Sequence, residues 1–159
     1  MKIDDTRSIR RPGNLFWCFI LCGCFAVCPA VAQVKQPAAA QGGEISKLVG
    51  DWVGKSVCVN KEKFPACNDE HVVYHIVVAP GKTDTVTLSA DKIVNGKPVP
   101  MGTFDFVYDA RKQTLTSEFK NERVHIIFEF AVKGDVLEGT LSSLPERTLA
   151  RRIRVKKDK

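Results

Sequence analysis

The chain has 159 residues, of which 44% are hydrophobic and 26% are charged, and its formal net charge is +6. This length suits a single domain. The basic residues are spread along the sequence instead of gathering in one block, so we expect no nucleic-acid partner.

The first 32 residues have the organisation of a signal peptide. Basic residues between Lys2 and Arg11 precede an uninterrupted apolar run over residues 15–27, and the segment ends in an A-x-A pattern at Ala32. The run is too short to cross a bilayer comfortably, since a membrane helix needs roughly 20 apolar residues. We therefore predict cleavage after Ala32, a secreted or periplasmic location, and no transmembrane span in the mature chain.

The cysteines suggest an alternative way of processing the leader and one disulfide in the mature chain. Leu21–Cys24 resembles a bacterial lipobox, in which case cleavage would leave Cys24 as an acylated anchor. Four of the six cysteines lie in the leader, so only Cys58 and Cys67 remain in the mature chain. In an oxidising compartment they should form a disulfide, worth roughly 2–3 kcal/mol in the chain-entropy model.

After the leader we predict a flexible linker over residues 33–46 and a β-barrel domain over residues 47–159, with a possible helical turn at residues 44–49. From Gly50 onward apolar and polar residues alternate, which is typical of strands. Asn95-Gly96 is a strong hairpin signal, and Pro98 and Pro100 confine the strand that follows to an edge or a bulge. The predicted strands cover residues 50–59, 71–79, 85–94, 97–101, 103–109, 113–119, 123–132, 136–143 and 147–157.

These eight or nine short strands with tight connections predict an all-β fold. We expect an antiparallel up-and-down meander that closes into a lipocalin-like barrel, because closure buries one face and removes exposed edges. A two-sheet sandwich is the alternative.

Gly50-Asp51-Trp52, at the opening of the first strand, resembles the G-x-W signature of the calycins, the group that includes lipocalins, fatty-acid-binding proteins and avidin-like barrels. The resemblance implies that Trp52 closes the barrel floor and stacks with an arginine of the last strand. Alternation places Arg151 on the same inner face as Ile153, so we predict structural roles for Gly50, Trp52 and Arg151 and a contact between Trp52 and Arg151.

The sequence contains no recognisable catalytic motif. A G-x-S-x-G elbow, a G-x-G-x-x-G loop and a phosphate loop are all missing. His71 and His75 lie on one strand face but roughly 13 Å apart, too far to share a metal ion. We therefore predict a non-enzymatic protein without cofactor or metal. Arg152, Arg154 and Lys156 should line the outer face of the last strand, with an anion-binding patch over the basic residues 151–157 as the alternative.

The aromatic residues bear most directly on function. Most should point into the barrel, where they either line a pocket for a small hydrophobic or amphipathic molecule or fill the interior. We expect an exported barrel that binds such a molecule. The alternatives are a protease-inhibitor-like module whose arm is formed by residues 33–44, and a structural envelope protein with a filled barrel. The candidate ligand-binding residues are Tyr74, Phe104, Phe106, Tyr108, Phe119, Phe128 and Phe130.

Overall fold

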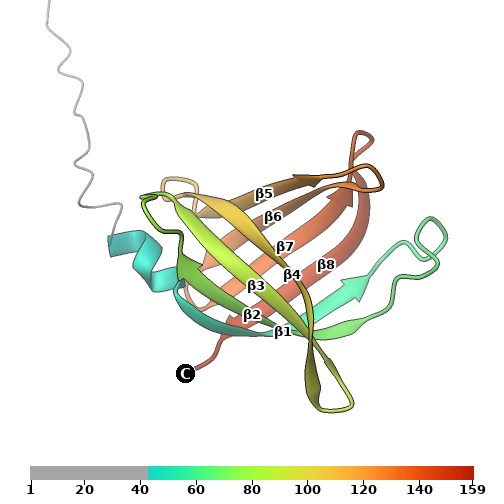
Figure 1. The fold of residues 1–159 in the computed structure, drawn as a ribbon, viewed down its shortest axis with the longest axis horizontal. Coiled ribbons are helices and arrows are strands. Elements are labelled where there is room, and N and C mark those ends of the chain that lie inside the picture. Colours follow the sequence, from blue (N-terminus) through green and yellow to red (C-terminus); the bar gives the residue numbers. More distant parts are fainter. Residues whose placement is uncertain (1–42) are drawn as a thin grey trace, which may run out of the picture. The chain divides into compact units, whose positions relative to one another are not determined.

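The computed structural model describes residues 43–159, and these form a closed barrel of eight antiparallel strands (Figure 1). Each strand pairs with the next along the chain, and β8 pairs with β1 to close the sheet. The predicted all-β meander and barrel closure are therefore confirmed, and the two-sheet sandwich is excluded. The strands are β1 (Gly50–Cys58), β2 (Glu70–Val78), β3 (Thr85–Val94), β4 (Lys97–Asp109), β5 (Thr114–Lys120), β6 (His125–Lys133), β7 (Val136–Ser143) and β8 (Thr148–Lys157).

The alternation of side chains explains why these segments form a barrel. In β2, Val72, Tyr74 and Ile76 are buried, whereas the residues between them are more exposed. In β8, Ile153 and Val155 are buried between exposed basic residues. Successive side chains on a strand point to opposite faces, so each strand contributes one apolar row to a common interior.

β4 is one long strand where the sequence predicted two. Pro98 and Pro100 lie in its first half, which pairs with β3 across a register shift. Pairing with β5 begins only at Val107, so the prolines have no neighbouring strand on that side. A residue without a backbone N–H is tolerated where no partner strand needs a donor. The two prolines therefore leave the strand intact.

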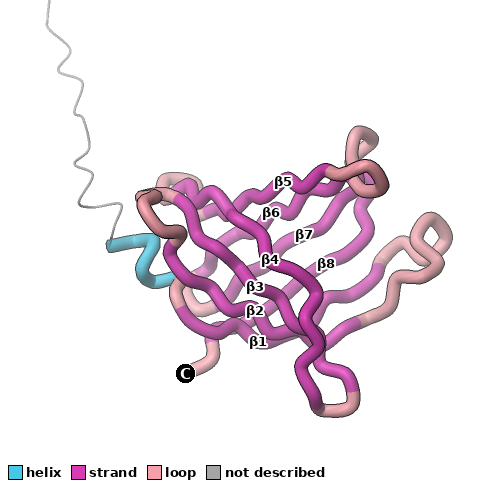
Figure 2. Tube along the Cα trace, in the orientation of Figure 1, coloured by secondary structure: helices cyan, strands magenta, loops and turns pink. Residues whose placement is uncertain are grey.

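The connections lie at the two ends of the strands (Figure 2). The disulfide loop (residues 59–69) and the β5–β6 and β7–β8 connections lie at what we call the open end. The β2–β3, β4–β5 and β6–β7 connections lie at the closed end, together with the short 3-10 helix η1 (Ser46–Leu48).

The residues before β1 pack against the barrel. Ile45 and Leu48 are 3% and 1% exposed and belong to the same apolar core as Trp52. The helical turn expected at residues 44–49 is confirmed, and Ile45 and Leu48 are the side chains that it contributes to the core. The predicted signal peptide, the alternative anchor at Cys24 and residues 33–42 of the linker lie outside the described residues. Within residues 43–159, no helix is long and apolar enough to cross a membrane.

Candidate functional site

The closed half of the barrel is filled by its own side chains. Trp52 is completely buried, and its indole Nε1 donates a hydrogen bond of 2.8 Å to the carbonyl oxygen of Leu48. Leu115 and Leu137 are also fully buried. A buried indole N–H needs an acceptor, and Leu48 of η1 supplies it. Trp52 and η1 together therefore close this end of the barrel.

The open half contains a cavity of about 260 Å³. Most of its lining is apolar, with five aromatic side chains and several aliphatic ones. Ligand sites in proteins are mostly apolar and concave, with volumes of about 300–1,000 Å³, so this cavity lies just below the usual range. The interior is thus filled at one end and hollow at the other. The aromatic lining residues are Tyr74, Phe104, Phe106, Phe128 and Phe130.

These rings form one continuous cluster. The centres of the Phe104 and Phe128 rings lie 5.3 Å apart, those of Phe106 and Phe130 lie 5.7 Å apart, and Tyr74 meets Phe130 edge-on at 6.2 Å. Such contacts add about 0.5–1.5 kcal/mol each beyond the burial of area. The cluster therefore gives the cavity a rigid aromatic wall.

Gly139 of β7 makes room for this wall. A Cβ at this position would overlap Cδ1 of Phe130 and lie 2.5 Å from the backbone oxygen of Glu129. No side chain fits there without moving the backbone, so the glycine lets the Phe130 ring lie directly on the neighbouring strand.

Arg151 provides the polar boundary of the cavity. Its Nε donates to Ser56 Oγ at 2.7 Å, and one terminal nitrogen donates to Ser56 O at 3.1 Å, Asn68 O at 2.7 Å and Glu70 Oε2 at 2.8 Å. The other terminal nitrogen lies 3.2 Å from Cys67 Sγ. The guanidinium thus joins the barrel wall to the disulfide loop, and its charge is matched by Glu70.

Tyr74 contributes a neutral polar group. Burial raises the pKa of its hydroxyl, and the nearby Arg151 charge offsets this only in part. The hydroxyl forms no hydrogen bond with any other side chain or backbone group of residues 43–159 in this structure, so it is available to a bound molecule. Arg151 and Glu70 are the only charged side chains among the lining residues described, and the cavity is therefore electrically neutral overall.

The predicted contact between Trp52 and Arg151 is wrong. Antiparallel pairing of β1 with β8 places Trp52 opposite Lys157 and Cys58 opposite Arg151. The two side chains share the inner face but lie at opposite ends of the strand pair. Lys157 takes the predicted place, with its Nζ 5.7 Å from the centre of the Trp52 ring. Its ammonium also donates a hydrogen bond of 2.6 Å to the carbonyl oxygen of Lys47.

Two of the seven candidate aromatic residues lie outside the cavity. Tyr108 is buried at the closed end, where its backbone N–H bonds to Asp84 O. Phe119 is 38% exposed and packs edge-on against Phe104, with the ring centres 5.8 Å apart. Alternation shows which face of a strand a residue occupies but not its position along the barrel axis. The sequence therefore could not separate these two rings from the five that line the cavity.

The disulfide between Cys58 and Cys67 is present, as predicted. It closes the loop that Arg151 holds against the barrel. The loop backbone is further fixed because Asp69 accepts a hydrogen bond of 2.9 Å from the Cys58 N–H.

The histidines lie on the outer surface. His75 Nδ1 is 2.7 Å from Asp51 Oδ1, and its Nε2 is 3.4 Å from Asp91 Oδ2. The hydrogen bond to Asp51 is the main reason that the pKa of His75 is raised. His125 Nε2 lies 2.7 Å from Glu118 Oε1. In the described part of the chain, no three His, Cys, Asp or Glu side chains cluster closely enough to hold a metal ion.

Comparison with models of known protein families gives no match, and neither does comparison with curated protein sequences. Among solved structures, the chain is similar to a mutant of the fluorescent protein UnaG, with a TM-score of 0.45 and 14% identity over 72% of this chain and 99% of that one. It is also similar to the siderocalin Ex-FABP, with a TM-score of 0.34 and 13% identity over 70% of this chain and 71% of that one. The strand order and the closure of the sheet, together with the buried tryptophan that opens β1, give this chain a calycin-like β-barrel fold.

Proposed function

We propose that this protein is an exported, non-enzymatic barrel that binds a small, uncharged and mainly apolar molecule in the open half of its interior. The observation that carries the proposal is the cavity of about 260 Å³ with its five aromatic side chains. The burial of a ligand there removes apolar surface from water at roughly 25 cal/mol per Å².

The size and polarity of the cavity define the ligand class. A 150 Å³ engineered cavity holds benzene, so this one suits a ligand of about one or two rings. A carboxylate would find no free cation, because Arg151 already binds Glu70 and Ser56. A hydroxyl or carbonyl group, by contrast, can pair with the Tyr74 hydroxyl. An uncharged ligand with one polar group fits best.

Binding of two matched probes tests the proposal. 1-Aminonaphthalene is neutral at pH 7 and 1-naphthoate is anionic, and both fluoresce. We expect saturable one-to-one binding of the neutral probe, at least about tenfold tighter than that of the anion, which corresponds to about 1.4 kcal/mol. If neither probe binds saturably, the proposed binding function fails; if the anion binds more tightly, the assignment of an uncharged ligand fails.

A cavity-filling variant locates the binding site. Ala90 lines the cavity, whereas Val107 is 55% exposed on the outer face. Ala90→Phe should abolish binding of the neutral probe, because the new ring occupies the space. Val107→Phe adds the same ring outside the barrel and should leave binding unchanged. Equal binding by the two variants would place the probe elsewhere on the protein.

Export is the second part of the proposal, and it rests on residues 1–32 of the sequence. The intact mass of the protein recovered from the periplasm of a bacterial host should correspond to a chain that begins at Gln33. A mass that retains the leader would contradict export with cleavage. An acylated chain that begins at Cys24 would instead identify a lipoprotein.

A further inference from the structure

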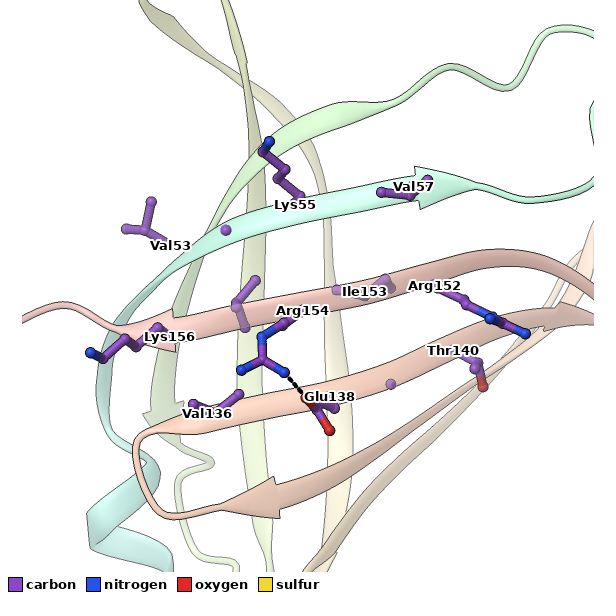
Figure 3. Close-up of a pocket in the computed structure, with 13 residues that line it drawn as sticks. Val53, Lys55, Val57, Val136, Glu138, Thr140, Arg152, Ile153, Arg154 and Lys156 are labelled. Carbon is purple, nitrogen blue, oxygen red and sulfur yellow. Dashed lines mark hydrogen bonds and ion pairs between the residues drawn. The ribbon is translucent and has the colours of Figure 1, made fainter.

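A groove of about 780 Å³ runs along the outer face of β1, β8 and β7 (Figure 3). β8 lies between the other two strands and presents Arg152, Arg154 and Lys156 outward at alternate positions. All three side chains are exposed. Residues two apart on a strand are about 6.6–6.8 Å apart, so the groove carries a regular row of cations.

Apolar side chains border this row. Lys156 is opposite Val53 of β1 and Val136 of β7, and Arg152 is opposite Val57 of β1. Val53 and Val57 are 44% and 39% exposed. The groove therefore combines cations along its centre with exposed aliphatic surface at its sides.

Most of the positive charge in the groove is not neutralised by the protein itself. Glu138 is the only acidic side chain among the described lining residues, and it pairs with Arg154 and with Lys133. Lys55, Arg152 and Lys156 form no ion pair with any group in residues 43–159. Three cations are thus directed to solvent within one groove.

We propose that this groove binds an extended acidic segment of a partner polypeptide, with carboxylates at every second residue. Side chains on one face of an extended peptide repeat at the same spacing as the cations of β8. Consecutive carboxylates can therefore meet Lys156, the nitrogens of Arg154 that do not bond Glu138, and Arg152 in turn. β8 is already paired with strands on both sides, so its backbone cannot accept another strand. Recognition must therefore come from side chains and depend on charge.

The regular spacing of the cations favours a polypeptide chain over a membrane. Arg152, Arg154 and Lys156 occupy alternate positions of one strand, and carboxylates on one face of an extended peptide repeat with the same spacing. Lipid headgroups have no such fixed spacing along a line.

Peptides of equal composition test the spacing. We would measure the fluorescence anisotropy of a labelled peptide of alternating Glu and Thr, and of a block peptide with the same residues, with the full mature chain at low ionic strength. The alternating peptide should bind at least about tenfold more tightly, and its binding should be lost at ~1 M salt, where the screening length is about 3 Å. Equal binding of the two peptides would overturn the proposed match of spacing.

Charge reversal locates the site. Arg152→Glu combined with Lys156→Glu should weaken binding of the alternating peptide at least about tenfold. Lys97→Glu combined with Lys120→Glu makes the same change in net charge on β4 and β5, far from β8 in the strand order. This control should weaken peptide binding only by the small amount that the change in net charge of the whole protein causes. Arg152→Gln with Lys156→Gln repeats the test with less perturbation of folding. Unchanged binding in both groove variants would overturn the proposal, and so would binding to phosphatidylglycerol vesicles through these residues without binding of the peptide.

Discussion

The network around Arg151 gives the sharpest prediction of stability. Arg151→Met removes the guanidinium but keeps a side chain of similar length on the inner face of β8. Glu70 then loses its 2.8 Å ion pair, and Ser56 Oγ and Asn68 O lose their donors. We expect the free energy of unfolding to fall by about 2–3 kcal/mol.

This magnitude follows from the burial of the pair. Breaking a fully buried ion pair costs about 3–5 kcal/mol, because one charge is left without a partner. Here the side chains of Arg151 and Glu70 are 15% and 22% exposed, so water solvates part of the remaining charge. Lys92 Nζ, 3.8 Å from Glu70 Oε1, compensates in part as well. The expected cost therefore lies below the fully buried range.

Urea denaturation with the disulfide intact measures the effect. Arg152→Met is the matched control. Arg152 is the exposed neighbour of Arg151 in the sequence, so its replacement should change the free energy of unfolding by no more than about 0.5 kcal/mol. In the Arg151→Met background, Glu70→Gln should restore about 1 kcal/mol or more, whereas in the wild type it should destabilise. Equal costs for the two arginine variants, or an identical effect of Glu70→Gln in both backgrounds, would refute the reasoning.

Three further substitutions test other parts of the barrel. Trp52→Phe should lower stability to urea by about 2 kcal/mol, because it removes buried volume and leaves the Leu48 carbonyl without its donor; a loss under about 0.5 kcal/mol would contradict this. Gly54→Ala should lower stability by about 2 kcal/mol or more in the same assay, since its Cβ would overlap the backbone oxygen of Arg154, and a variant as stable as wild type would be inconsistent with that clash. His75→Gln should remove a pH dependence of the folding stability. The pKa of His75 is raised on folding, so its contribution to stability is complete below its unfolded pKa of about 6.5 and is lost as pH rises through the folded pKa. The difference in melting temperature between wild type and His75→Gln should therefore shrink from about pH 5.5 to pH 8, and a constant difference would count against the ion pair.

Much of the fold was predictable because burial on one face imposes a period of two. The bounds of β3 and β7 match the prediction, and the inward row of β6 was identified from its phenylalanines. The prediction that β4 is two strands was wrong because a proline interrupts a strand only where a neighbour needs its N–H. That depends on how far β5 extends alongside β4, which is not a local property of the sequence.

The site was predictable only in part. Alternation correctly placed Arg151 and six of the seven candidate aromatic residues inside, but it contains no information on register. The pairing of β1 with β8 decides which inner residues meet, and it brings Lys157 to Trp52. Glu70 was missed, although the same alternation that places Val72, Tyr74 and Ile76 inside also places Glu70 there.

The seam between β1 and β8 has a consequence for the folding of the barrel. Trp52 to Cys58 pair with Lys157 to Arg151, so the first strand of the sheet obtains its second neighbour only from the last. Without β8, β1 and β7 would each present a hydrogen-bonding edge without a partner. Closure of the sheet therefore depends on a contact between segments about a hundred residues apart in the sequence, and contacts of this kind form slowly.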